Sequence, residues 1–162
     1  MFEAPTEWIS PESFPDLKDY KYIAIDLETR DPDLKSRGSG AIIGNGEIVG
    51  IAVAVEGWSG YYSFGHSEGN FFDKTVVMSW IKEVCALPNV KLFHNAMYDV
   101  CWLKAYGVPV NGHIVDTMVM ASLIDENRFF YSLNSLSIDY LGQVKDETAL
   151  RDAADKAGID AK

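Results

Sequence analysis

The sequence predicts one α/β domain built on a mixed five-stranded sheet with helices packed against it. Three strand-like segments come first, at residues 22–29, 48–55 and 60–64, and helices and strands then alternate as far as residue 141. Of the 162 residues, 48% are hydrophobic, which is enough to bury a sizeable core. Three strands followed by this alternation are typical of a mixed sheet whose first three strands form a meander.

Charge and composition limit the possible classes of function. The formal net charge is -10, whereas a module that grips phosphate by itself normally has a basic face. The negative charge does not exclude nucleic acid as a substrate. Bound cations neutralise part of the acids of a site, and a neighbouring domain can hold the strand. Cys85 and Cys101 have no metal-binding spacing, so we interpret them as reduced core thiols.

No apolar run approaches the roughly 20 residues of a membrane span, and the N-terminus has no signal-peptide pattern. We therefore expect a cytoplasmic protein with no membrane partner. Residues 1–20 are predicted to form an arm, because prolines interrupt them and no periodic pattern is present. Trp8 and Phe14 are expected to pack this arm onto the body of the domain.

The first strand, Tyr22–Thr29, has the sequence YIAIDLET and ends in two acids. Residues i and i+2 of a strand point to the same face, so Asp26 and Glu28 are expected side by side. Two carboxylates held that close repel each other unless a cation lies between them, and this favours a divalent metal. Taken alone, the pair is equally compatible with two solvated acids at a strand end.

The next segment, Arg30–Glu47, is rich in glycine and has Lys35 and Arg37 near its tip. It predicts a solvated loop, with a mobile flap beside the site as the alternative. Ile48–Val55 and Gly60–Phe64 follow as two strands joined by a tight turn, which predicts a hairpin.

Apolar residues that recur at three and four positions predict a helix from Phe72 to Leu87, which Pro88 ends. The remaining predicted elements are a strand at Val90–Phe93, a helix at Asn95–Tyr106 closed by Gly107, a strand at His113–Val115, a helix from the N-cap Asp116 to Ile124, a helix at Ser132–Leu141, and a polar tail at 143–162 with a helix near Thr148–Ala157.

Asp99 is the third acid of interest. It lies in the first turns of the helix that follows a buried strand, and we expect it on a different face of that helix from Trp102 and Leu103. If the first strand is central, its carboxyl end and the start of this helix come together, as sites in open α/β sheets do. Asp26, Glu28 and Asp99 would then converge on the same metals.

Four stretches together resemble a known family. YIAIDLET, HNAMYDVCWL, IVDTMVMASLID and SLNSLSIDYL are similar to motifs of the proofreading 3′-5′ exonuclease domain of family A DNA polymerases. That domain belongs to the DnaQ-like (DEDD) superfamily and has an RNase H-like fold. The resemblance covers residues 21–142, and the long first loop and opening Met suggest a phage-type enzyme, which would place it in the host cytoplasm. Asp-x-Glu alone is a weak pattern, but its combination with Asn-x-x-x-Asp at the start of a helix is specific.

The resemblance implies a role for each matching residue. Asp26 would bridge two metal ions, Glu28 would complete one of them and Asp99 would hold the other through water. Thr29 would meet the 3′ end, and Asn95 and Tyr98 would line the site near the scissile phosphate. The cofactor would be Mg²⁺ or Mn²⁺, two ions per complete site, and the product a nucleoside 5′-monophosphate. The implied partners are single-stranded DNA 3′ ends and a polymerase domain.

The family completes its site with a fourth carboxylate in a Tyr-x3-Asp or His-x4-Asp pattern. The only matches here are Tyr22 with Asp26 and His94 with Asp99, and both lie inside the other motifs. We therefore expect a domain that stops before its third motif, so that these 162 residues bind Mn²⁺ weakly and cleave poorly or not at all. A longer parent polypeptide would be active.

Several alternatives stay open at this point. The same superfamily contains RNase D-like 3′-5′ exoribonucleases, and the fold could also survive as a non-catalytic nucleic-acid-binding or scaffold module. Asp116 is better explained as an N-cap than as a metal ligand. His66 and His113 are interpreted as structural or exposed residues rather than catalytic ones.

Overall fold

The computed structural model describes residues 9–144, 148, 151, 152 and 155. The chain forms two compact units, one made of residues 10–126 and the other of residues 1–9 with 127–162. Each unit is described by itself. The predicted boundaries of an arm at 1–20, a domain at 21–142 and a tail at 143–162 stay a prediction.

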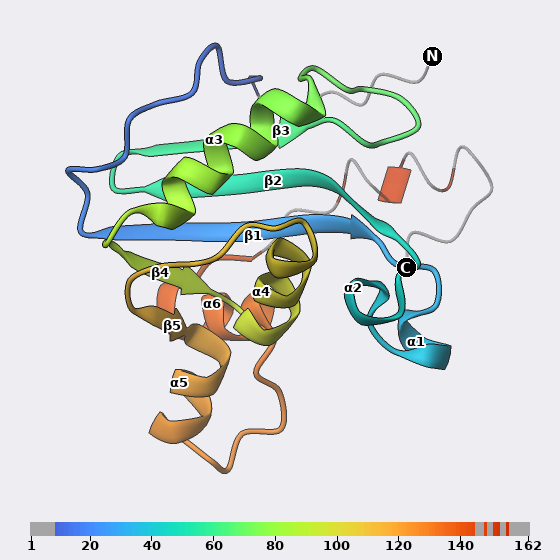
Figure 1. Ribbon diagram of the computed structural model, residues 1–162. Coiled ribbons are helices and arrows are strands. Elements are labelled where there is room, and N and C mark those ends of the chain that lie inside the picture. The colour runs from blue at the N-terminus through green and yellow to red at the C-terminus, as the bar shows by residue number, and fades with distance from the viewer. Residues whose placement is uncertain (1–8, 145–147, 149–150, 153–154, 156–162) are drawn as a thin grey trace. The chain divides into compact units, whose positions relative to one another are not determined.

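The first unit is organised around one mixed sheet (Figure 1). The order of its strands is β3-β2-β1-β4-β5, so the first strand of the chain is the central one. β2 pairs antiparallel with both β1 and β3, whereas β4 pairs parallel with β1 and β5. The bounds are β1 (Tyr22–Arg30), β2 (Glu47–Val55), β3 (Trp58–Ser63), β4 (Val90–Phe93) and β5 (Ile114–Asp116). The predicted meander and five-stranded sheet are confirmed.

Three helices of this unit follow the sheet strands as predicted, within one or two residues at each end. They are α3 (Lys74–Ala86), α4 (Ala96–Ala105) and α5 (Thr117–Ile124). The prediction of a plain loop between β1 and β2 is wrong, because this segment contains α1 (Leu34–Arg37) and α2 (Gly40–Ile43). The Asp31 carboxylate accepts the Gly40 N–H at 3.0 Å, and Gly44, at φ 74°, ends α2 in the left-handed region that favours glycine. Neither the Asp31 hydrogen bond nor the left-handed Gly44 leaves a periodic pattern of apolar residues in the sequence, and a four-residue helix is too short to show one.

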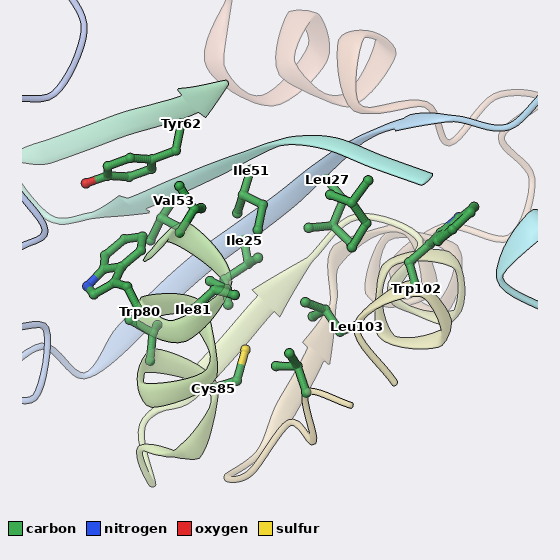
Figure 2. Packing of buried hydrophobic residues seen from close by; sticks show 14 of the residues in the cluster. Ile25, Leu27, Ile51, Val53, Tyr62, Trp80, Ile81, Cys85, Trp102 and Leu103 are labelled. Atoms are coloured by element: carbon green, nitrogen blue, oxygen red, sulfur yellow. The ribbon is translucent and has the colours of Figure 1, made fainter. Parts of the chain in front are cut away.

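The core lies on one face of the sheet. Ile23, Ile25 and Leu27 alternate along β1 and are buried. Figure 2 shows Ile25 and Leu27 with Ile51 and Val53 of β2, packed against Ile81 and Cys85 of α3 and Leu103 of α4. Because side chains alternate, Asp26 and Glu28 of the same strand point to the opposite face.

Residues 10–20 pack onto this unit beside β3 and α3. The Phe14 ring stacks on the Tyr62 ring with centroids 4.9 Å apart, and the Tyr62 hydroxyl donates to the Ser13 carbonyl at 2.8 Å. Trp80 of α3 donates its indole N–H to the Pro15 carbonyl at 3.1 Å. The predicted packing of Phe14 is confirmed, whereas Trp8 lies outside the described residues.

The second unit contains α6 (Leu133–Leu141), which Ser132 caps by accepting the Ser135 N–H. This confirms the predicted helix, while most of the helix expected near Thr148–Ala157 lies outside the described residues. Among the residues that the structure describes, no helix is long and apolar enough to cross a membrane.

Candidate active site

Asp26 and Glu28 lie on the exposed face of β1, next to very small neighbours. Asp26 is directly opposite Ala52 of β2, and Glu28 is directly opposite Gly50. Both carboxylates are exposed, because neither cross-strand neighbour has a side chain large enough to cover them. A bulge follows at once, since Thr29 pairs with Ile48 and Val49 is left over. The strand therefore changes direction just after its second acid.

Asp99 lies in the first turn of α4 and is only 3% exposed. The prediction that it faces away from Trp102 and Leu103 is wrong. Residues three and four positions apart share a helix face, and all three side chains are buried. β4 pairs with β1 only as far as Ala24, so the backbone of β1 beyond that point is available to α4. The Leu27 N–H, between the two exposed acids, lies near enough to the Asp99 carboxylate to lower its pKa.

Burial raises the pKa of Asp99 to about 7, and the negative charge of Asp26 is the next largest cause. The Leu27 N–H acts in the opposite direction, and the Asp116 carboxylate adds to the rise. The structure therefore brings Asp99 of α4 close to Asp26 of β1, as the sequence predicted. A cation between these two carboxylates would remove a repulsion that the fold creates.

Asp116 joins the starts of two helices. Its carboxylate caps α5 by accepting the Met118 and Val119 N–H groups at 2.9 and 3.3 Å. It also accepts the Asn95 and Ala96 N–H groups at the start of α4, at 3.1 and 2.8 Å. The interpretation of Asp116 as an N-cap is confirmed, and its second connection, to α4, has no counterpart in the sequence pattern.

Asn95, the residue before α4, has a left-handed backbone with φ 71°. In the part of the chain that the structure describes, it is the one residue other than glycine with a positive φ. Its side chain is exposed, while its N–H is bound by Asp116. A strained backbone that neighbouring contacts hold in place is typical of functional sites.

Thr29 and Tyr98, both predicted to meet substrate, contact each other. Their hydroxyl oxygens are 2.6 Å apart, and the Tyr98 hydroxyl also donates to Asp31 at 3.1 Å. Because Tyr98 has a single hydroxyl proton, Thr29 is the donor in the first hydrogen bond. These bonds fix the end of β1 against α4, next to Glu28 and one turn from Asn95.

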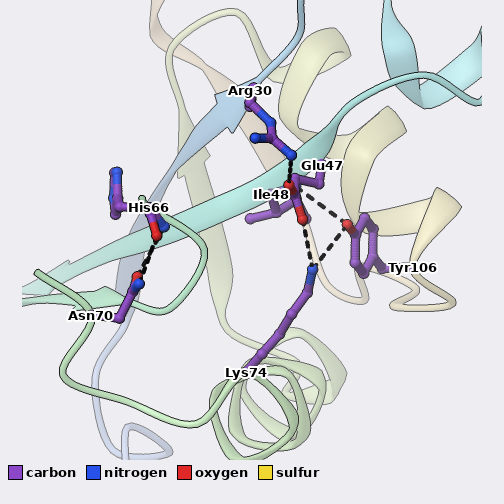
Figure 3. A network of polar contacts seen from close by, with 7 residues as sticks. All are labelled: Arg30, Glu47, Ile48, His66, Asn70, Lys74 and Tyr106. Atoms are coloured by element: carbon purple, nitrogen blue, oxygen red, sulfur yellow. Dashed lines mark hydrogen bonds and ion pairs between the residues drawn. The ribbon is translucent and has the colours of Figure 1, made fainter. Parts of the chain in front are cut away.

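A polar network that sequence patterns did not predict holds the same end of the sheet (Figure 3). Glu47 pairs with Arg30 and with Lys74 of α3, the latter at 3.6 Å. The Tyr106 hydroxyl, at the end of α4, accepts the Lys74 ammonium and the Ile48 N–H, each at 3.3 Å. Bonded partners in this network lie up to 58 positions apart in the sequence, so no local pattern could have revealed them.

Oxygen donors dominate this region, which suits Mg²⁺ or Mn²⁺. Within residues 9–144 and the four described residues beyond them, no three His, Cys, Asp or Glu side chains are grouped closely enough to hold a metal. Asp26 and Asp99 form the pair that the fold brings together. Glu28 lies one row farther along β1.

Comparisons with known proteins match the chain to an exonuclease family and to phage DNA polymerases. A family model described as 3′-5′ exonuclease matches residues 7–158. A DNA-directed DNA polymerase of Pseudomonas phage M6 is 32% identical over 97% of this chain and 25% of its own length. The DNA polymerase DpoZ of Salmonella phage PMBT28 is 29% identical over 79% of this chain and 18% of its length. The chain thus spans a quarter or less of these relatives.

Solved structures share the fold at low sequence identity. Trypanosoma brucei RNase D, in a complex with RNA, has a TM-score of 0.60 and 18% identity over 85% of this chain and 45% of that one. Brucella melitensis NrnC with bound Mg²⁺ has a TM-score of 0.59 and 13% identity over 83% of this chain and 61% of that one. The mixed sheet with flanking helices is therefore shared with these two proteins.

Proposed function

Because the chain belongs to the 3′-5′ exonuclease family, we propose that it serves as the proofreading exonuclease domain of a phage DNA polymerase in the host cytoplasm. It would hydrolyse the 3′-terminal phosphodiester of single-stranded DNA and release a nucleoside 5′-monophosphate. The observation that supports this most is the buried Asp99 carboxyl close to Asp26 of the central strand. A polymerase domain elsewhere in the protein would be its partner.

Asp26, Glu28 and Asp99 would hold the divalent ions, Mg²⁺ or Mn²⁺, with two ions in a complete site. Carboxylate oxygens are suitable ligands, and the mutual repulsion of Asp26 and Asp99 favours a cation between them. Bound ions of this kind lower the pKa of the attacking water and stabilise the departing 3′ oxygen.

The other residues of the site would position the strand. The Thr29–Tyr98 pair presents a rigid wall, because both hydroxyls are already fixed by hydrogen bonds to each other and to Asp31. The exposed Asn95 side chain, three residues before Tyr98, has an amide that can donate to a phosphate oxygen. Asp116 holds the Asn95 backbone, so the amide starts from a defined position.

Metal binding is measurable without catalysis. Mn²⁺ at ten times its dissociation constant is expected to stabilise the chain by about 1.4 kcal/mol, which raises Tm by roughly 3 to 5 °C. Asp26→Ala should abolish the rise, whereas Asp19→Ala, which removes an exposed acid outside the site, should keep it. Differential scanning fluorimetry with Mn²⁺ against EDTA is the measurement. A wild-type chain that does not respond would instead favour a non-catalytic module.

Substrate preference separates the two nuclease functions. The RNase D-like neighbours make a 3′-5′ exoribonuclease the second candidate. With 5′-labelled strands of the same sequence and Mn²⁺, we expect slow shortening of single-stranded DNA from its 3′ end and slower shortening of RNA. Asp26→Ala is the control for contaminating nucleases. Faster shortening of the RNA strand would make the exoribonuclease the better assignment.

A further inference from the structure

Tyr61 of β3 lies on the same face of the sheet as the two exposed acids. It is directly opposite Ala52, which is in turn opposite Asp26. Residues in register across a sheet project to the same side, so Asp26, Ala52 and Tyr61 form one row. Glu28 and Gly50 belong to the next row.

The Tyr61 ring leans from its own row onto Gly50. A Cβ atom added to Gly50 would lie 2.1 Å from the Tyr61 hydroxyl oxygen and 2.5 Å from the ring carbon that bears it. Any larger residue at position 50 would therefore displace the phenol. Gly50 is the direct cross-strand neighbour of Glu28. The Tyr61 hydroxyl therefore lies near the Cα atom of Glu28.

A second contact of the Tyr61 hydroxyl is with His66. Its oxygen is 2.5 Å from Nε2 of His66, in the segment between β3 and α3. The Asn70 side chain binds the His66 backbone twice: Oδ1 accepts the His66 N–H at 2.9 Å, and Nδ2 donates to the His66 carbonyl at 2.7 Å (Figure 3). These two hydrogen bonds hold the backbone of His66 in place within its loop.

We propose that Tyr61 is a positioning residue for the Glu28 carboxylate and that His66, held by Asn70, sets the direction of the Tyr61 hydroxyl. The inference rests on the proposed function, in which Glu28 is a metal ligand. Metal-binding side chains commonly depend on a hydrogen-bonded partner that fixes their orientation.

The proposed contact between Tyr61 and Glu28 would set the direction of each hydrogen bond. An ionised carboxylate can only accept, so the single proton of the Tyr61 hydroxyl is used best toward Glu28. His66 must then donate from Nε2–H to the Tyr61 oxygen. A tyrosine hydroxyl keeps its proton at neutral pH, so it is available as the donor.

Tyr62 offers a matched control on the same strand. It points to the opposite, core face, where its hydroxyl donates to the Ser13 carbonyl at 2.8 Å. Tyr62→Phe removes one phenol oxygen, as Tyr61→Phe does, but its effect should be confined to stability. His66→Gln places an amide nitrogen the same number of bonds from Cα as Nε2, so it can still donate, whereas His66→Ala cannot.

The test is a Mn²⁺ titration of the full 162-residue chain and its variants, followed by calorimetry or by Tm. Tyr61→Phe is expected to weaken the apparent Mn²⁺ affinity about tenfold. His66→Ala should weaken it several-fold, and His66→Gln should recover most of the loss. Tyr62→Phe should lower Tm without metal and leave the affinity within about twofold of wild type.

Two results would overturn the proposal. Wild-type affinity in Tyr61→Phe would show that the phenol does not position Glu28, while the metal site itself would stand. An equal loss in Tyr62→Phe would show that a general loosening of β3 explains the effect. If the wild-type chain itself fails to bind Mn²⁺, the proposed function fails together with this inference, and that outcome is distinct from both others.

Discussion

Asp99→Asn is expected to stabilise the metal-free chain at pH 8 by up to about 4 kcal/mol and to remove its response to Mn²⁺. The folded chain raises the pKa of this carboxyl from 3.8 to about 7, so at pH 8 folding must bury a charge that the fold disfavours. Asparagine keeps an oxygen that can accept the Leu27 N–H, but it has no charge. The fold therefore gives up stability to keep an acid at this position.

The pH dependence gives the sign of this effect. Below about pH 4 both the folded and the unfolded chain hold the Asp99 proton, so the difference between wild type and variant vanishes. Between about pH 4 and pH 7 only the folded chain keeps it, so wild type loses stability relative to the variant as pH rises. Above about pH 7 the difference is constant.

Urea unfolding in EDTA at pH 4, 5.5 and 8 measures this difference. Asp19→Asn is the control, since it removes an exposed carboxyl outside the site and should give the same free energy of unfolding as wild type at each pH. A variant no more stable than wild type at pH 8 would contradict the burial of an uncompensated carboxylate at position 99.

Asp116→Ala is expected to destabilise the chain by about 3 kcal/mol at pH 7, because four backbone N–H groups from two helices lose their acceptor. Burial alone would raise the pKa of Asp116. The four donors together lower the pKa by more than burial raises it, so the net shift is downward. Its contribution is thus present at neutral pH and is lost as pH falls through the folded pKa, below 3.8.

Asp73→Ala is the matched control, because Asp73 caps α3 by accepting only the Thr75 and Val76 N–H groups. It should cost about 1 kcal/mol, as an ordinary N-cap does. Equal losses in the two variants, measured by urea unfolding, would show that the bonds from Asp116 to α4 add nothing. In the expected case Asp116→Ala also frees the start of α4 and reduces the repulsion on Asp99.

The frame of the fold was predictable because its strands and helices have strong periodic patterns. β1 alternates apolar and polar residues, which gave both its position and the shared face of Asp26 and Glu28. The N-cap Asp116 marked the start of α5 correctly. By contrast, α1 and α2 depend on Asp31 and on a left-handed glycine, which a short glycine-rich segment does not reveal.

The supporting contacts of the site could not be predicted in the same way. Asp99 was recognised, but its face was assigned wrongly, although its spacing to Trp102 and Leu103 already implies a shared face. Thr29 and Tyr98 were each expected to contact substrate, and only the structure joins them to each other. The position of Tyr61 over Gly50 depends on the register between β1, β2 and β3, and one sequence does not specify that register.

The unequal pairing of β1 has a consequence for the order in which the chain folds. β1 pairs with β2 through seven residue pairs and with β4 through three. Closing the loop from Ala24 to Leu92 costs roughly 0.7 kcal/mol more in conformational entropy than closing the one from Ala24 to Ala54. Synthesis runs from the N-terminus, so β1, β2 and β3 are made before β4 and α4. Asp26 and Glu28 are therefore made well before Asp99, and the proposed site is complete only once β4 and α4 have joined the central strand.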